Sequence, residues 1–132
     1  MKTKFHEFNL SSTYKGDKAW KGMPKNTNNH IITVTNTETN KRTRFEFWES
    51  LSETEITTER QLINAFECFL SDALATTNCR DVWDFFSEFG YEPTRENYEI
   101  YKACQRALKK AQRVIGDEER LCDLINEISE AA

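Results

Sequence analysis

The hydrophobic period of the chain changes once, near residue 50, and this change limits the folds that are open to it. Before residue 50 apolar residues alternate with polar ones, as in half-buried β-strands, and after it they recur every three or four residues, as in amphipathic helices. No glycine- or proline-rich linker separates the two parts. We therefore expect one α+β domain over residues 1–132, in which a small antiparallel sheet of about three strands packs against about four helices.

Three segments carry strand signals. Residues 4–10 place Phe8 and Leu10 on one face, and the stronger pair, residues 30–37 and 41–48, alternates apolar with polar side chains. The segment between that pair, residues 38–40, ends in Asn40, and asparagine tolerates left-handed backbone geometry. We expect a hairpin turn there.

Four helices are expected after residue 57. Thr58 and Gln61 form a capping-box pattern at the start of the first helix, whose apolar stripe should face the sheet. The second runs from about residue 80 to 89 and ends at Gly90, the third begins at Arg95, and Asp117 caps the fourth after Gly116. The residues expected to be buried are Leu62, Ile63, Phe66, Phe69, Leu70, Ala73, Val82, Phe85, Phe86, Phe89, Tyr98, Tyr101, Cys104 or Gln105, Leu108, Ala111, Ile115, Leu121, Leu124, Ile125 and Ile128.

Composition narrows the class of protein. Of the 132 residues 38% are hydrophobic and 12% aromatic, which is enough for a core and excludes a disordered chain. No apolar run approaches the ~18 residues of a membrane span, and the first residues lack the apolar segment of a secretory signal, so we expect a cytosolic protein. Residues 1–50 carry a net charge of +4 and residues 51–132 one of −8, which favours partners of complementary charge.

The four cysteines, Cys68, Cys79, Cys104 and Cys122, show no metal-site spacing. No Cys-x-x-Cys pair occurs and no histidine lies nearby in sequence, which argues against a zinc site. In the cytosol the thiols should be reduced, and Cys68, Cys104 and Cys122 lie in or beside apolar helical stripes. We expect buried, unreactive cysteines, and neither a metal nor a cofactor.

Motifs of the common enzyme classes are missing from the sequence. It contains no glycine-rich phosphate loop, no Gly-x-Ser-x-Gly elbow and no His-Glu-x-x-His. His6 and His30 have no serine or cysteine partner at a recognisable spacing, so we interpret them as ordinary residues. We predict no catalytic residue and a protein that is not an enzyme.

A long irregular stretch, residues 11–29, is a candidate binding loop. It combines two aromatic side chains with lysines, and a loop of ~19 residues in a compact domain is often functional. The candidate partner-binding residues in it are Tyr14, Lys18, Trp20 and Lys21. Alternatively the stretch wraps around the fold and buries Trp20 as an anchor.

Six carboxylates lie close together in the sequence after the first helix. They are Asp81, Asp84, Glu88, Glu92, Glu96 and Glu99. A surface of this charge can bind a basic channel that normally holds nucleic acid. Paired acids could also serve acid–base chemistry or ligate a hard cation, but the polar side of an amphipathic helix needs solvated residues and is the plainer interpretation.

A basic stripe follows on the third helix. Lys102, Arg106, Lys109, Lys110 and Arg113 recur at helical spacing with no acid among them. Such a stripe is typical of phosphate contacts and predicts, as an alternative, direct nucleic-acid binding. It could equally pair with the acidic helices around it, through surface contacts of ~0–1 kcal/mol each.

The segment Trp83-Asp84-Phe85-Phe86-Ser87-Glu88-Phe89-Gly90-Tyr91-Glu92, with Tyr98, Tyr101-Lys102-Ala103-Cys104 and a helix ending near Val114-Ile115-Gly116-Asp117, resembles a family of small uncharacterised phage and prophage proteins. The Phe45-Glu46-Phe47 strand is similar as well, so the likeness covers roughly residues 30–120. Its residues are mostly aromatic and capping positions, and it carries no catalytic residue. The resemblance implies a small phage accessory protein that acts in a bacterial cytoplasm.

Three functional hypotheses follow from this resemblance and from the charge pattern. The leading one is an anti-CRISPR-like inhibitor, which binds a bacterial defence complex such as a CRISPR effector through the acidic cluster and the loop, and blocks nucleic-acid binding or cleavage. The second is a nucleic-acid-binding accessory protein that uses the basic stripe. The third is a small enzyme or nucleotide-sequestering protein with a pocket that sequence does not reveal.

Overall fold

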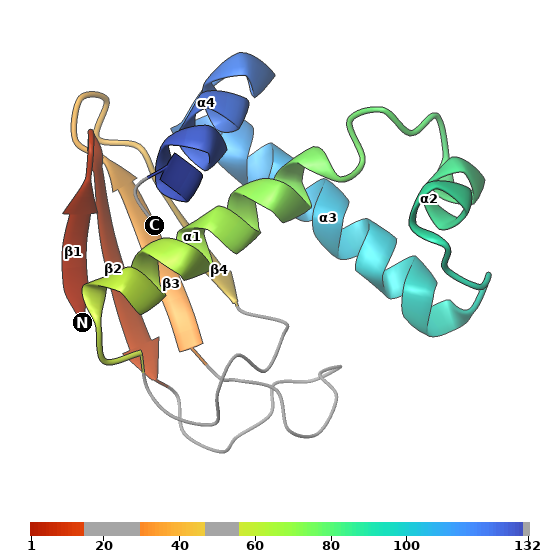
Figure 1. The fold of residues 1–132 in the computed structure, drawn as a ribbon, viewed down its shortest axis with the longest axis horizontal. Helices are drawn as coiled ribbons and strands as arrows, with labels where there is room; N and C mark the ends of the chain where they lie inside the picture. Colours follow the sequence, from red (N-terminus) through yellow and green to blue (C-terminus); the bar gives the residue numbers. More distant parts are fainter. Residues whose placement is uncertain (15–29, 47–55, 131–132) are drawn as a thin grey trace. The chain divides into compact units, whose positions relative to one another are not determined.

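A computed structural model describes residues 1–14, 30–46 and 56–130. The chain is α+β, with a four-stranded antiparallel sheet in its N-terminal part and four helices in its C-terminal part (Figure 1). The strands are β1 (Lys2–Phe5), β2 (Phe8–Tyr14), β3 (His30–Asn36) and β4 (Arg42–Glu46), and the helices are α1 (Glu59–Leu74), α2 (Val82–Phe89), α3 (Arg95–Val114) and α4 (Glu118–Glu130). The predicted fold class is confirmed, with one strand more than expected.

Backbone contacts divide the chain into two compact units, Met1–Phe66 and Glu67–Ala132. Helix α1 runs without a break through the boundary between them. The first unit holds the sheet and the first half of α1, and the second holds the rest of α1 with α2, α3 and α4. That residues 1–132 form one domain stays a prediction.

The sheet of the first unit has its strands in chain order, β1-β2-β3-β4, each antiparallel to the next (Figure 1). Its register places Leu10 opposite Val34 and Ile32 opposite Phe45. Because side chains alternate between the faces of a strand, one face of this sheet is apolar and buried. The residues on it are Phe8, Leu10, Ile32, Val34 and Phe45.

The first half of α1 packs on this apolar face. The ring of Phe8 lies 5.6 Å from that of Phe66, centroid to centroid, and both side chains are fully buried. Leu62 and Ala65 on the same helix are buried too, at the spacing expected for one helical face. The predicted contact between this stripe and the sheet is confirmed for the part of α1 that lies in the first unit.

The predicted first strand, residues 4–10, is wrong, because the structure breaks it into β1 and β2. His6 and Glu7 form a tight turn between the paired residues Phe5 and Phe8, and His6 has a φ of 52°. No glycine, asparagine or proline marks this turn, so the alternation of the sequence gave no sign of it. Histidine is one of the few residue types enriched at positive φ, which is the signal that was available.

The turn between β3 and β4 forms where the sequence predicted it. The side-chain Oδ1 of Asn36 accepts hydrogen bonds from the backbone nitrogens of Glu38 and Thr39, at 3.0 and 3.4 Å, and Asn40 has a φ of 61°. The predicted strand over residues 30–37 was one residue too long, since β3 ends at Asn36, and β4 begins at Arg42, one residue after the predicted start. Residues 47 and 48 of the predicted strand lie outside the described residues.

The helix ends also follow the local sequence. Gln61 N donates to Thr58 Oγ1 at 3.1 Å and Thr58 N donates to Gln61 Oε1 at 3.1 Å, which is the predicted capping box. Gly90 takes the left-handed conformation, φ 68° and ψ 28°, at the end of α2. Arg120 N donates to Asp117 Oδ1 at 3.0 Å and so confirms the cap of α4.

We expect Phe66→Ala to lower the free energy of unfolding by ~3–5 kcal/mol, because it removes a buried ring and leaves a cavity opposite Phe8. Denaturant unfolding followed by circular dichroism measures the change. The control is Arg42→Ala at an exposed position, which should stay within ~0.5 kcal/mol of the wild type. Equal stability of Phe66→Ala and the wild type would contradict the packing of α1 on the sheet.

Candidate functional site

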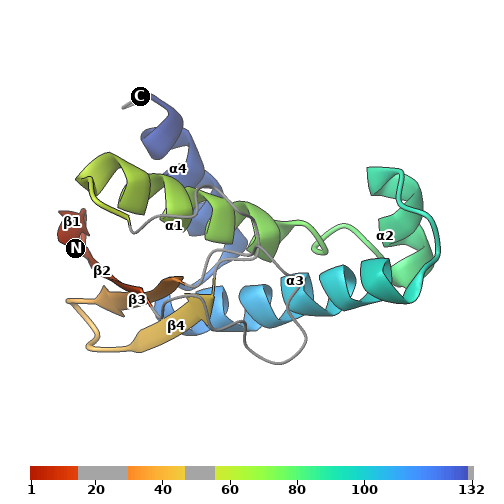
Figure 2. The same cartoon turned by 90° about the horizontal axis from the view of Figure 1, so that it is seen from below.

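Helix α2 is held to α3 by a small buried cluster. Phe85, Phe86 and Cys104 are buried at its centre, and the half-buried side chains around them are Ala75, Cys79, Val82, Ile100 and Tyr101. The ring of Phe85 lies 5.2 Å from that of Tyr101, and Figure 2 shows α2 beside the first turns of α3. This cluster positions the side chains that α2 presents to solvent.

Four large aromatic side chains around this cluster are exposed. The exposed fractions are 65% for Trp83, 46% for Phe89, 39% for Tyr91 and 40% for Tyr98, and we call these four residues the aromatic surface. The predictions that Phe89 and Tyr98 are buried are therefore wrong. Phe89 is in the last turn of an eight-residue helix, and Tyr98 lies on α3 away from the face of Cys104, so neither ring is covered.

The exposed rings are braced against buried or neighbouring rings. Phe89 and Tyr91 stack with centroids 6.2 Å apart and planes at 23°, and both lie within 5.7 Å of Phe85. Trp83 meets the buried Phe86 edge to face at 5.9 Å. Such contacts limit the freedom of the exposed rings, so a partner that binds them has less side-chain entropy to remove.

Tyr98 carries a cation on its face. The ammonium of Lys102, one helical turn further along α3, lies 4.8 Å from the centroid of the Tyr98 ring. This is within the range of a cation–π interaction. The aromatic surface thus ends beside the first residue of the basic stripe.

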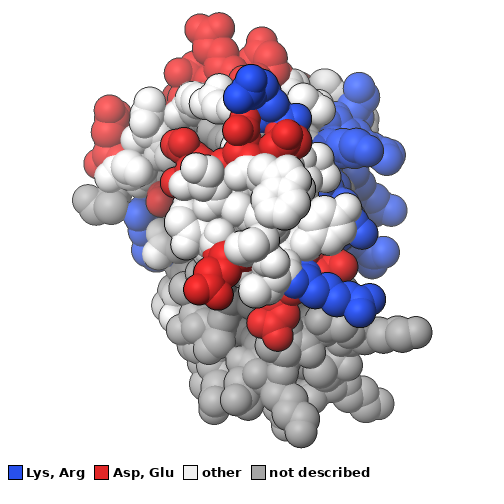
Figure 3. Space-filling model, turned by 90° about the vertical axis from the view of Figure 1, so that its right-hand side faces the viewer, with Lys and Arg blue, Asp and Glu red and all other residues white. Residues whose placement is uncertain are grey.

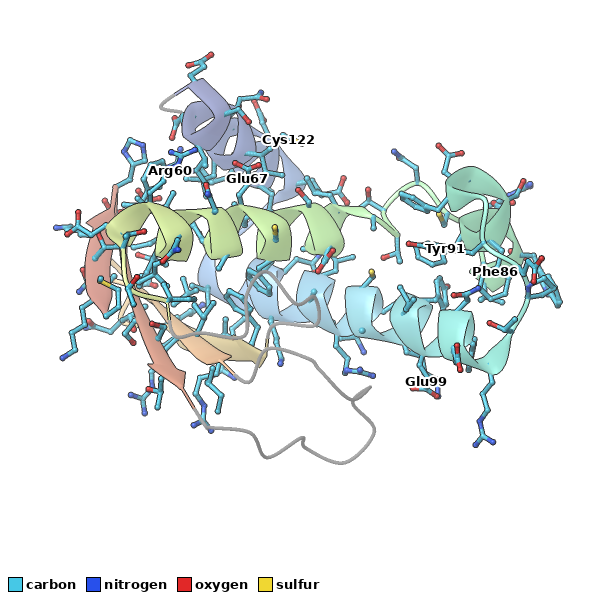
Figure 4. The ribbon with its side chains drawn as sticks, turned by 60° about the horizontal axis from the view of Figure 1, so that its bottom comes forward. Arg60, Glu67, Phe86, Tyr91, Glu99 and Cys122 are labelled. Atoms are coloured by element: carbon cyan, nitrogen blue, oxygen red, sulfur yellow. The ribbon has the colours of Figure 1, made fainter. Side chains whose placement is uncertain are left out.

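Acidic side chains border the aromatic surface, but the six predicted ones do not form one group. Glu88, Glu92 and Glu96 are exposed, on α2, in the connection after it and in the first turn of α3. Figure 4 shows that Glu99 points away from α2, on the outer side of α3. Figure 3 shows an uncharged area on the face that carries α2, with acidic groups at its borders and basic groups gathered along one edge.

Two of the six acids have a structural role. Asp81 is the N-cap of α2, and its Oδ1 accepts a hydrogen bond from the backbone nitrogen of Asp84 at 2.9 Å. Asp84 Oδ2 accepts from both the backbone nitrogen and Nε of Arg80, each at 3.1 Å. These two acids therefore secure the start of α2, which begins at Val82, two residues after the approximate start predicted at residue 80.

Of the four loop residues predicted to bind a partner, the structure describes only the backbone of Tyr14. Tyr14 is the last residue of β2, where its backbone pairs with His30. Lys18, Trp20 and Lys21 lie outside the described residues.

The two residues that sequence reasoning missed are Trp83 and Tyr91. The available signal for Trp83 was a tryptophan placed beside, rather than on, the apolar stripe of its helix.

The basic stripe lies on the outer side of α3. Arg106, Lys109 and Arg113 are exposed, while Lys102 and Lys110 are half-buried. The buried residues of the same helix are Cys104, Ala111 and Val114. Gln105, offered as an alternative to Cys104 in the buried stripe, is exposed.

The cysteines differ in environment. Cys104 is buried, and burial first, then the Asp72 carboxylate, raises the pKa of its thiol to about 12. Burial, followed by the charges of Asp84 and Glu88, raises the pKa of Cys79. Cys122 is exposed, so the prediction that it is buried is wrong. It follows Leu121 by one residue, which turns it about 100° from that buried position.

No helix among residues 1–14, 30–46 and 56–130 is long and apolar enough to cross a membrane. The same described ranges contain no cluster of three or more histidine, cysteine or acidic side chains with the geometry to hold a metal ion. A comparison with protein-family models, curated proteins and solved structures finds no match for this chain. The surfaces of α2 and α3 are therefore interpreted from their own chemistry.

We expect the pKa of Asp84 to lie below its usual value of ~3.9, because Arg80 donates two hydrogen bonds to the charged carboxylate. The stabilisation from this group is then present at neutral pH and is lost as the pH falls through that lowered pKa. A carboxyl-carbon NMR titration measures it. Arg80→Gln should raise the pKa toward its ordinary value, whereas Arg95→Gln should leave it unchanged; equal effects of both would contradict the assignment.

We expect iodoacetamide at about pH 8 to modify Cys122 first and Cys104 only after unfolding, because the thiolate is the reactive form and Cys104 is both buried and hard to ionise. Mass spectrometry of peptides from timed samples gives the order. Modification of Cys104 at the rate of Cys122 in the folded protein would contradict the packing between α2 and α3.

Proposed function

We propose that this protein acts by binding another protein through the aromatic surface and the carboxylates beside it. The observation that carries this proposal is the exposure of Trp83, Phe89, Tyr91 and Tyr98 within sixteen residues of sequence. Large aromatic side chains gathered on a surface mark interaction sites, and tryptophan and tyrosine dominate the binding energy of protein interfaces.

The charge around the aromatic surface specifies the kind of partner. Glu88, Glu92 and Glu96 are exposed and lie within two residues of Phe89, Tyr91 and Tyr98 in sequence, so a complementary protein carries basic groups around an apolar or aromatic-binding centre. Grooves that hold nucleic acid are basic. If this surface occupied such a groove, it would block the nucleic acid sterically, and its carboxylates would pair with the basic groups that otherwise bind phosphates.

In its specific form, the proposal is a phage-encoded, non-enzymatic inhibitor of a bacterial defence complex, acting in the bacterial cytoplasm. Two things support it: the resemblance of residues 83–92 to small phage proteins, and the exposed acids that neighbour the aromatic residues in sequence. A CRISPR effector is one such complex, because its nucleic-acid channel is positively charged. The inhibitor would bind before the target nucleic acid and prevent its loading or cleavage.

The test is an affinity pull-down of the tagged protein from lysates of bacteria that carry defence systems, read by mass spectrometry. We expect one protein complex in stoichiometric amount. Trp83→Ala with Tyr91→Ala should weaken its binding about 30-fold or more, as interface hot-spot residues do, while the buried cluster under them keeps α2 folded.

Charge reversal tests the acidic border separately. Glu88→Lys with Glu92→Lys should weaken binding, and Glu118→Lys with Glu119→Lys, the matched change at exposed positions on α4, should not. Asp81 and Asp84 are left intact because Asp81 caps α2 and Asp84 holds Arg80 at its start. Recovery of no protein, or equal loss with both pairs of reversals, would contradict the proposed site.

A further inference from the structure

Helix α3 carries a second surface that the proposed function does not use. Its five cations, the basic stripe, are Lys102, Arg106, Lys109, Lys110 and Arg113, and no acidic residue occurs between Ile100 and Gly116. Each residue of a helix is turned about 100° from the one before it, so the five lie within an arc of about 100°. That arc is opposite the buried residues Cys104 and Ala111.

The stripe is a continuous line of charge along the helix. From Lys102 to Arg113 the helix rises about 16 Å, at ~1.5 Å for each residue. Successive phosphates of one nucleic-acid strand are several ångströms apart, so a line of this length faces several of them. Lysine and arginine contact phosphates without any need for an apolar surface between them.

The charges in the stripe repel one another. Lys102 and Arg106, and likewise Lys109 and Arg113, stand four residues apart, where like charges destabilise a helix by a few tenths of a kcal/mol for each pair. Within the described part of the chain, no acidic side chain forms an ion pair with Arg106, Lys109 or Arg113. By contrast Arg80 pairs with Asp84 at 3.1 Å, and Arg120 approaches Glu127 at 3.8 Å.

The composition of this surface distinguishes between classes of partner. The large exposed hydrophobic residues of the described chain are Met1, Trp83, Phe89, Tyr91 and Tyr98, and none of them lies between Lys102 and Arg113. A protein interface needs an apolar core, and a helix that lies in a membrane surface needs an apolar face toward the lipid. A polyanion needs neither, because neutralised phosphates release their counterions.

We propose that the basic stripe of α3 binds the phosphate backbone of a nucleic acid, independently of the aromatic surface. Binding offsets the repulsion within the stripe and requires no base-specific contact. The protein then contacts a protein partner through one side of α3 and α2, and nucleic acid through the outer side of α3. The association weakens steeply with added salt.

The experiment measures binding of the full chain to fluorescent single-stranded and double-stranded DNA of about 20 nucleotides by anisotropy, between ~50 and ~200 mM salt. We expect a Kd of ~10⁻⁴–10⁻⁶ M at the low end of this range. The test variant is Arg106→Gln with Lys109→Gln and Arg113→Gln. This variant should bind DNA about tenfold more weakly than the wild type. For duplex DNA, the slope of the logarithm of the binding constant against that of the salt concentration should become shallower by about 0.9 for each phosphate contact that is lost.

The matched control removes the same charge elsewhere, by Lys2→Gln with Lys4→Gln and Arg42→Gln at exposed positions of the sheet. It should retain wild-type affinity, and circular dichroism should show that both triple variants stay folded. The comparison between the two DNA arms tells which form of backbone the stripe prefers. No binding by the wild type at low salt, or equal loss in both variants, would overturn the proposal.

A third arm uses vesicles with anionic lipid. If the protein binds these vesicles through the stripe but does not bind DNA, the partner of the stripe is a membrane surface and the proposal is overturned. Trp83→Ala with Tyr91→Ala should leave DNA binding unchanged, so failure of the protein-binding site and failure of the nucleic-acid site are observed separately.

Discussion

The packing of Phe85 and Phe86 onto α3 is the contact on which α2 and the aromatic surface depend. An isolated helix of eight residues is unstable in water, so α2 exists because these two rings are buried against Ile100, Tyr101 and Cys104. The same contact places Phe89 and Tyr91 beside Phe85 and holds Trp83 against Phe86. The exposed aromatic surface is thus the outer layer of a small aromatic core.

Charge is segregated along α3, and the helix itself favours that order. Glu96 lies in the first turn, where the partial positive charge of the helix end stabilises an acid, and Arg113 lies in the last turn, where the opposite end stabilises a cation. The cations in the middle of the stripe gain little stabilisation from the charges of the helix ends, and they still repel one another. The proposed protein-binding surface accordingly lies toward the start of α3 and the proposed nucleic-acid-binding stripe toward its end, and Tyr98 with Lys102 marks where they meet.

The sequence predicted the elements and most of their ends, because caps and turns depend on contacts within a few residues. The Thr58–Gln61 box, the turn at Asn40 and the stop at Gly90 are each made by side chains or backbone close in sequence. The break between β1 and β2 was missed because His6, the residue at positive φ, is not a usual turn marker. Asp81 and Asp84 were assigned to a binding patch although their spacing is also that of a helix cap.

Sequence by itself determined the α+β class, the buried faces of the sheet and of α1, and the two stretches of like charge. Only the tertiary structure decided which apolar residues are covered and where each acid points. Phe85 and Phe89 are four residues apart on one helix, yet Phe85 is buried and Phe89 is exposed, because burial requires a neighbouring element and α3 covers only one of them. Exposure therefore depends on what packs beside a residue, and that partner is distant in sequence.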